Sequence, residues 1–175
     1  MVTVKDISDY VDTLAPYNTK CEWDNCGLLV GDESKQVSKI GFALDLTEET
    51  LRDAIKNNVD MIVTHHPIIF KAQKSFLKGN MAYELAYNGI SAVSAHTCFD
   101  CAEGGVNDVL CEILELTDVE GVPTEECSEP LVRIGNLGYD NLLTSEEFAK
   151  TVSFSPYSPS CKNSCKKTRH NSKIS

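Results

Sequence analysis

The chain has 175 residues, of which 42% are hydrophobic and 24% are charged, so its length and composition suit one globular domain with a sizeable core. Its formal net charge of −10 argues against a general nucleic-acid or membrane-surface binder, because both need a basic face. No apolar run approaches the roughly 20 residues that a membrane-spanning helix needs, and the N-terminus has no secretory signal pattern. We therefore expect a cytoplasmic protein that binds neither DNA nor a membrane.

The first residues predict a helix that is followed by a short strand. Residues 4–14 carry apolar side chains at helical spacing, Thr3 can cap the first turn, and Pro16 ends the helix. A polar loop comes next and leads to an apolar run between Gly27 and Gly31, which predicts a short strand.

A β-α-β unit is expected in the next part of the chain. Residues 39–46 form a candidate strand, and a helix begins at Thr47 with acidic residues in its first turn. An apolar, β-branched run then ends at His65 and His66 and is closed by Pro67, which predicts a buried strand that ends at the two histidines. The helical connection makes the two strands parallel.

A second unit repeats this order. Residues 78–87 have helical spacing, and residues 90–95 form a strand that leads to His96 and Asp100. The remaining expected elements are an amphipathic helix over 106–114, a weaker strand over 131–138 and a helix from residue 145.

Side chains at the carboxyl ends of parallel strands meet at one edge of the sheet, so His65, His66 and Asp100 are predicted to converge. Imidazole and carboxylate ligands suit zinc, iron, nickel or manganese, and two adjacent imidazoles at one strand end favour two ions over one. The alternative is one buried structural histidine beside one exposed histidine. Weaker candidates for catalytic or outer hydrogen-bonding roles are His96, Glu103 and Asp45.

The eight cysteines are expected to be reduced, because no export signal is present. Cys98 and Cys101 have the spacing of a redox pair or of half a zinc site, and both remain open as alternatives. Cys161 and Cys165 have a different spacing, so no second Cys-x-x-Cys pair completes a zinc site.

Three segments, residues 22–31, 64–70 and 95–107, resemble the GTP cyclohydrolase I type 2 homologue family, whose members are also called Nif-three-like or dinuclear metal centre proteins. The resemblance covers roughly residues 1–150 and implies a mixed, partly parallel α/β sheet flanked by helices. It also implies that His65, His66 and Asp100 hold two divalent metal ions per subunit in a homo-oligomer, which is a hexameric ring in the family. The implied function is a metal-dependent hydrolase, in which hydroxide attacks the purine ring of GTP or another small-molecule nucleotide.

The chain departs from the family after residue 150. The family supplies a further His and Glu near its C-terminus, whereas the only later histidine here is His170, with no glutamate after it. Residues 151–175 are rich in serine, with five Lys or Arg residues and no acid, so we expect a separate tail that is disordered or read from a shifted frame. A non-catalytic metal-binding scaffold oligomer and an inactive truncated fragment are therefore alternatives to a hydrolase.

Overall fold

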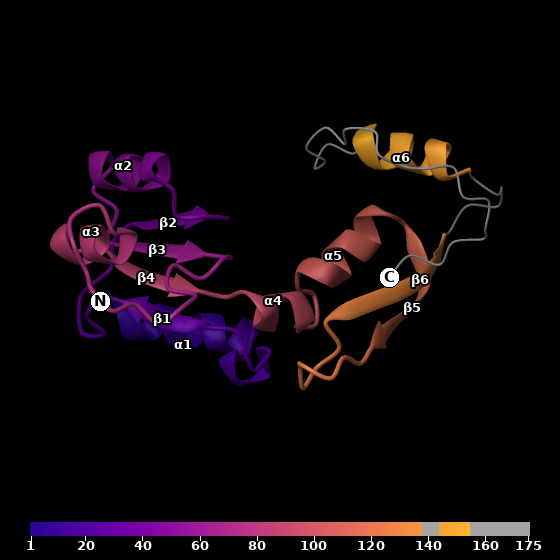
Figure 1. Cartoon of the computed structure of the whole chain (residues 1–175), viewed down its shortest axis with the longest axis horizontal. Coiled ribbons are helices and arrows are strands. Elements are labelled where there is room, and N and C mark those ends of the chain that lie inside the picture. The colour runs from indigo at the N-terminus through magenta and orange to yellow at the C-terminus, as the bar shows by residue number, and fades with distance from the viewer. Residues whose placement is uncertain (138–143, 155–175) are drawn as a thin grey trace.

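The computed structural model describes residues 1–137 and 144–154 (Figure 1). Its elements are, in chain order, α1 (Val4–Leu14), the 3-10 helix η1 (Tyr17–Thr19), β1 (Gly27–Val30), β2 (Ile40–Ala43), α2 (Glu48–Lys56), β3 (Met61–Thr64), α3 (Met81–Tyr87), β4 (Ser91–Ser94), α4 (Thr97–Cys101), α5 (Val106–Ile113), β5 (Leu116–Val122), β6 (Val132–Leu137) and α6 (Ser145–Phe154). In this described part, no helix is long and apolar enough to cross a membrane.

Four strands form the main sheet in the order β1-β4-β3-β2 (Figure 1). Strands β2, β3 and β4 are parallel, and β1 is antiparallel to β4. This confirms the predicted mixed, partly parallel α/β sheet and the β-α-β unit that runs from β2 through α2 to β3. Strands β5 and β6 form a separate antiparallel pair, which follows α5 along the chain.

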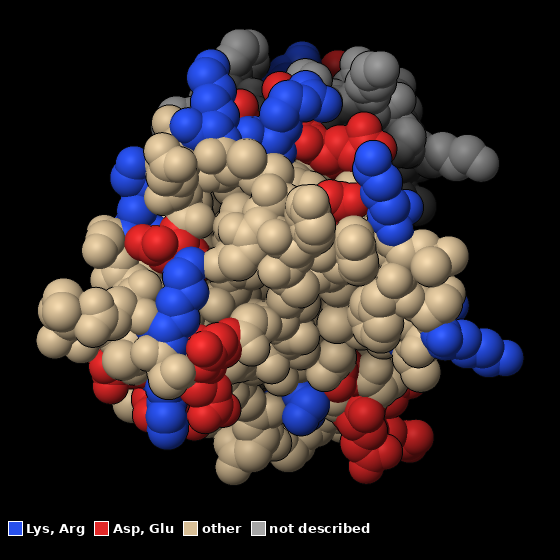
Figure 2. Space-filling model, turned by 90° about the vertical axis from the view of Figure 1, so that its left-hand side faces the viewer, with Lys and Arg blue, Asp and Glu red and all other residues tan. Residues whose placement is uncertain are grey.

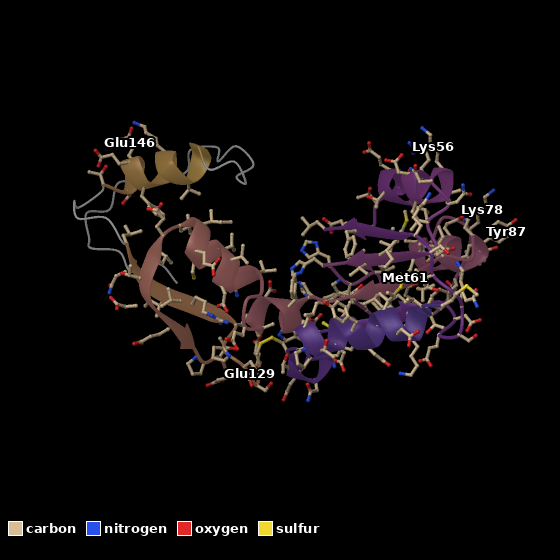
Figure 3. All side chains as sticks on the ribbon, turned by 180° about the vertical axis from the view of Figure 1, so that it is seen from behind. Lys56, Met61, Lys78, Tyr87, Glu129 and Glu146 are labelled. Carbon is tan, nitrogen blue, oxygen red and sulfur yellow. A yellow bond between two sulfur atoms is a disulfide. The ribbon has the colours of Figure 1, made fainter. Side chains whose placement is uncertain are left out.

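Helices cover both faces of the main sheet. Successive side chains of a strand point to opposite sides, so the strands supply core residues to the helices on each face. Ile62 of β3 and Ala92 of β4 pack against buried residues of α2 and α3. Their neighbours Met61 and Val93 point the other way and pack with Val4 of α1; Figure 3 labels Met61 between the sheet and α1. The sheet is therefore the middle layer of three.

The N-terminal caps form as predicted. The Thr3 side chain accepts a hydrogen bond from the backbone N–H of Asp6, and the Asp6 carboxylate accepts one from the N–H of Thr3. Thr47 caps α2 by accepting from the N–H of Thr50 at 3.1 Å. Such caps satisfy backbone donors that the first helical turn leaves unpaired.

Several element boundaries differ from those expected. Strand β2 is shorter than 39–46, and α3 begins at Met81 rather than at residue 78. Helix α4 and strand β5 were not predicted. Helix α6 runs past residue 150 to Phe154, and the prediction of a disordered or frameshifted tail otherwise lies outside the described residues.

The expectation that all cysteines are reduced is wrong for one pair, because Cys21 and Cys127 form a disulfide across a sequence separation of 106. Figure 3 shows this bond in yellow near Glu129. The fold brings the two cysteines together where the N–H of Glu22 donates to the carbonyl of Glu126 at 3.1 Å. In α4, Cys98 and Cys101 are separate buried thiols, so they form no disulfide pair, and Cys161 and Cys165 lie outside the described residues.

Figure 2 shows the end of the molecule near α2, α3 and the N-terminus. Lys and Arg side chains there are mixed with Asp and Glu around an uncharged area. A mixed surface of this kind creates no strong field of one sign. The carboxyl ends of β2, β3 and β4 lie on the opposite side, next to α4 (Figure 1), and the candidate functional residues follow these ends.

Candidate metal centre

The ends of β3 and β4 deliver three histidines to one place. The parallel register pairs Thr64 with Ser94, so the next residues of both strands leave the sheet together. The Thr64 hydroxyl donates to the carbonyl of His66 at 2.9 Å, which bends the chain directly after β3. Because of this bend, His65 and His66 do not alternate across the sheet, and their ring centroids lie 5.1 Å apart.

His96, which follows β4, completes a cluster of three imidazoles. Its ring centroid lies 5.1 Å from that of His65 and 5.5 Å from that of His66. One ring nitrogen from each residue lies within 4.8 Å of the other two, a spacing that would let all three reach one metal ion. His96 is therefore more central than its weaker rank in the sequence analysis suggested.

The hydrogen bonds of the rings decide which nitrogen can bind a metal. Nδ1 of His65 lies 3.0 Å from the carbonyl oxygen of Ala95. A carbonyl oxygen can only accept a hydrogen bond, so this Nδ1 carries the proton and Nε2 keeps its lone pair.

Carboxylates hold the other two rings in the same way. Nδ1 of His66 lies 2.6 Å from Oδ1 of Asp45, and Nδ1 of His96 lies 3.0 Å from Oδ1 of Asp24. Ionised carboxylates are acceptors, so each Nδ1 donates, and Nε2 is the nitrogen whose lone pair a neutral ring would offer to a metal ion. Metal-binding histidines are commonly fixed by such an outer oxygen. The donor set therefore fits a first-row divalent ion, with three Nε2 atoms as its nitrogen ligands.

The surroundings of His65 lower its pKa and place a carboxylate beside it. Burial lowers the pKa of His65, the charges of His96 and His66 lower it further, and Asp100 opposes them. Burial raises the pKa of Asp100, an effect that His65 opposes. Nε2 of His65 lies 3.6 Å from Oδ1 of Asp100. The structure thus brings Asp100 next to the paired histidines as expected, and its role as a metal ligand stays a prediction.

Asp24 is the residue that sequence reasoning missed. Its carboxylate is buried and accepts hydrogen bonds from the N–H and the hydroxyl of Thr97 as well as from His96. Burial raises the pKa of Asp24, but the hydrogen bonds from Thr97 and His96 outweigh it and leave the pKa at about 2. The local sequence predicted only a polar loop around Asp24. The one signal that could have identified Asp24 was its position in the family motif at residues 22–31.

The other weak candidates have different positions. Asp45 is half exposed and contacts His66, so it is an outer hydrogen-bond partner. Glu103 is exposed, and in the described ranges no hydrogen bond or ion pair joins it to an imidazole. His170 lies outside the described residues.

Comparisons with known proteins agree with this fold. The sequence profile of the Duf34/NIF3 (NGG1p interacting factor 3) family matches residues 2–172. A "GTP cyclohydrolase 1 type 2 homolog" of Clostridium perfringens is 41% identical over 115 residues, which are 63% of this chain and 44% of that protein. A protein of the same name from Listeria innocua is 36% identical over 143 residues, 79% of this chain and 38% of that protein.

Among solved structures, reduced HcgD from Methanocaldococcus jannaschii is similar, with a TM-score of 0.74 and 31% identity over 87% of this chain and 59% of that one. The aligned regions are 44% and 38% of the two curated relatives, so the chain spans less than half of their length. The profile match covers nearly all of its residues. The chain belongs to the Duf34/NIF3 (NGG1p interacting factor 3) family.

Proposed function

We propose that this chain binds divalent metal ions through His65, His66 and His96. The observation that carries the proposal is that each of the three Nδ1 atoms has an oxygen partner, which leaves three Nε2 lone pairs in one cluster. Asp100 lies beside His65 and is the residue that could join a second ion to the first.

The reaction class that fits this site best is metal-dependent hydrolysis of a small molecule, with GTP or another nucleotide as the substrate. A bound divalent ion supplies Lewis-acid polarisation and acidifies water. The chain itself orients the imidazoles. The Nδ1 atoms of the three rings donate hydrogen bonds to oxygen atoms of Ala95, Asp45 and Asp24, and these bonds fix the ring orientations. The printed name of the two curated relatives supports the GTP version. Because this chain covers only part of their length, the proposal concerns the activity of the whole protein.

A second candidate is a non-catalytic metal-binding scaffold that assembles as a homo-oligomer. It is favoured by the fact that Asp24 and Asp45 already accept hydrogen bonds from imidazoles. Neither carboxylate is therefore free to act as a general base.

Zinc titration by calorimetry tests metal binding. We expect His96→Ala to weaken zinc binding by more than about 100-fold, because loss of an outer partner alone typically costs 10- to 100-fold. Asp100→Asn should cost about tenfold. Asp9→Asn is the control, since Asp9 is an exposed acid of α1 that forms an ion pair with Lys5, and this variant should bind zinc like the wild type. Equal affinities of His96→Ala and the wild type would refute the metal site.

A formate-release assay with GTP then separates the two functions. Turnover by the zinc-loaded chain supports the hydrolase, and tight zinc binding without turnover supports the scaffold. A cooperative thermal unfolding transition would argue against the inactive-fragment alternative, because a piece of a core does not unfold as one unit.

A further inference from the structure

Two aromatic side chains stand next to the imidazole cluster and remain largely open to solvent. Trp23 is 45% exposed and Phe70 is 47% exposed. Their ring centroids lie 6.0 Å apart, and the Trp23 centroid lies 6.1 Å from that of His96. Single exposed aromatic residues need no explanation, but these two rings meet with their planes at 66° beside the imidazole cluster. They form two adjoining apolar walls, so a planar ring that stacks on one of them can pack its edge against the other.

The chain holds Trp23 in place from one side. Its indole Nε1 donates to Oε2 of Glu126 at 2.9 Å. The backbone next to it is tied to the same loop, because the N–H of Glu22 donates to the carbonyl of Glu126 and Cys21 is bonded to Cys127. The one polar atom of the indole is therefore satisfied, and the surface that Trp23 offers to a ligand is ring carbon.

Phe70 is connected to the same loop. The side-chain amide of Asn25 donates to the carbonyl of Ile69 at 2.6 Å. Ile69 directly precedes Phe70, and Asn25 lies two residues after Trp23, so this hydrogen bond joins the two segments. The Trp23 indole and the backbone that precedes Phe70 are thus held before any ligand arrives, which reduces the entropy that a ligand must spend to order this surface.

We propose that Trp23 and Phe70 form a stacking surface that binds the planar heteroaromatic ring of the substrate beside the imidazole cluster. The location of the chemistry rests on the proposed function, but ring binding does not require turnover. Stacking uses the π-face that every such ring has, and removal of one aromatic partner typically weakens binding by roughly 5- to 150-fold. A ligand without a ring has nothing to place on this surface.

The charges at the site separate ring binding from phosphate binding. The carboxylates of Asp24, Asp45 and Asp100 all contact the imidazoles. Without a cation they repel phosphate groups, whereas an uncharged nucleoside is unaffected. The metal-free chain should therefore bind guanosine through its base and bind ribose 5-phosphate poorly.

Trp23 is the only tryptophan of the chain, so its fluorescence reports on this surface alone. We would titrate the metal-free and zinc-loaded chain with guanosine, with ribose 5-phosphate as the probe that has no aromatic ring and free N-acetyltryptophanamide as the control for collisional quenching. The expected result is saturable quenching by guanosine and none by ribose 5-phosphate. Quenching that is linear and equal to that of the free amide would overturn the proposal.

Two variants test the role of Phe70. Phe70→Ala and Phe70→Leu should each raise the guanosine dissociation constant by about fivefold or more, and the leucine variant keeps apolar volume in case the alanine variant misfolds. Phe76→Ala is the control, since Phe76 is 50% exposed and forms no ring contact with Trp23 in the described part of the chain. Unchanged guanosine affinity in Phe70→Leu would refute the proposal.

The outcome is distinguishable from that of the proposed function. Guanosine binding without zinc binding or formate release would support the stacking surface and refute the hydrolase proposal. Zinc binding and turnover without saturable quenching of Trp23 fluorescence would support the hydrolase and refute the stacking surface.

Discussion

The carboxylate of Asp24 connects two parts of the site that are far apart in the chain. It receives the Nδ1 proton of His96 on one oxygen and both hydrogen bonds of Thr97 on the other. With a pKa of about 2 it stays ionised at neutral pH. Asp24→Asn keeps the size but turns one acceptor into a donor that faces the N–H of Thr97. We expect zinc affinity to fall by about 10- to 100-fold and stability to fall by about 1–3 kcal/mol.

Calorimetric zinc titration and urea unfolding measure these two effects. Asp9→Asn is the matched control, because Asp9 is an exposed acid of α1 that pairs with Lys5 at 2.7 Å. An exposed pair of this kind contributes little to stability. If Asp24→Asn binds zinc as tightly as Asp9→Asn does, Asp24 is not needed to orient His96.

Tyr17 makes stability depend on pH in the alkaline range. Burial raises the pKa of Tyr17 to about 12, although its hydrogen bond with the side-chain hydroxyl of Ser8 opposes this. An unfolded tyrosine ionises near pH 10. The stabilisation of the folded state by the raised pKa of Tyr17 is therefore complete below pH 10. It is lost as the pH rises from about 10 through 12, because the unfolded chain releases the proton first.

Tyr17→Phe should flatten this alkaline loss of stability, measured by urea unfolding at several pH values. At neutral pH the variant should lose about 1 kcal/mol, because the hydroxyl no longer donates to the carbonyl of Ser8. Tyr87→Phe is the control, since Tyr87 is 76% exposed. The same alkaline slope in both variants would contradict the prediction.

At the scale of elements, the turn between α4 and α5 positions the helix that carries Asp100. A Cβ at Gly105 would overlap the carbonyl oxygen of Phe99 and come within 2.8 Å of that of Ala102. Gly105→Ala must therefore displace the end of α4, and we expect a loss of about 1–3 kcal/mol in the free energy of unfolding. Gly104→Asn is the control, because that position has open space and asparagine tolerates its φ of +68°. Equal stability of the two variants in urea unfolding would contradict this packing argument.

The sequence predicted the elements whose signals are local and strong. The runs that end at His65 and at residue 95 are apolar and bounded, so both central strands and the approach of Asp100 to the paired histidines could be anticipated. Helix α4 has only five residues, too few for a periodic signal. Strand β5 is mostly exposed and contains Gly121, so it lacks the alternation of a half-buried strand.

Contacts between distant residues explain what could not be predicted. The acceptor role of Asp24 depends on Thr97, 73 positions away. The Cys21–Cys127 pair spans 106 positions, and pairing among eight cysteines cannot be read from their spacing. The two adjacent imidazoles come together where the chain bends after β3 and the Thr64 hydroxyl donates to the carbonyl of His66, and no local pattern in the sequence indicates this contact.

At the scale of the molecule, the imidazole cluster lies at the junction of two parts. Helix α4 leads from the main sheet to α5 and the β5–β6 pair (Figure 1). Arg133 of β6 donates to Asp108 of α5 at 2.7 Å and to the carbonyl of Cys101 in α4 at 3.0 Å. The disulfide ties the loop before β6 to the segment that holds Trp23. Changes in the second sheet can therefore reach the site through α4 and through this loop.

The outer edge of β2 is the most exposed part of the main sheet. Among the described residues β2 pairs only with β3, and its residue Phe42 is 78% exposed. An unpaired edge with an exposed aromatic side chain favours pairing with other chains. We expect Phe42→Lys to lower the light scattering of concentrated solutions, because a charge on an edge strand opposes such pairing. Tyr87→Lys changes the net charge equally at an exposed position of α3, so a similar decrease in both variants would show that charge, and not the β2 edge, controls association.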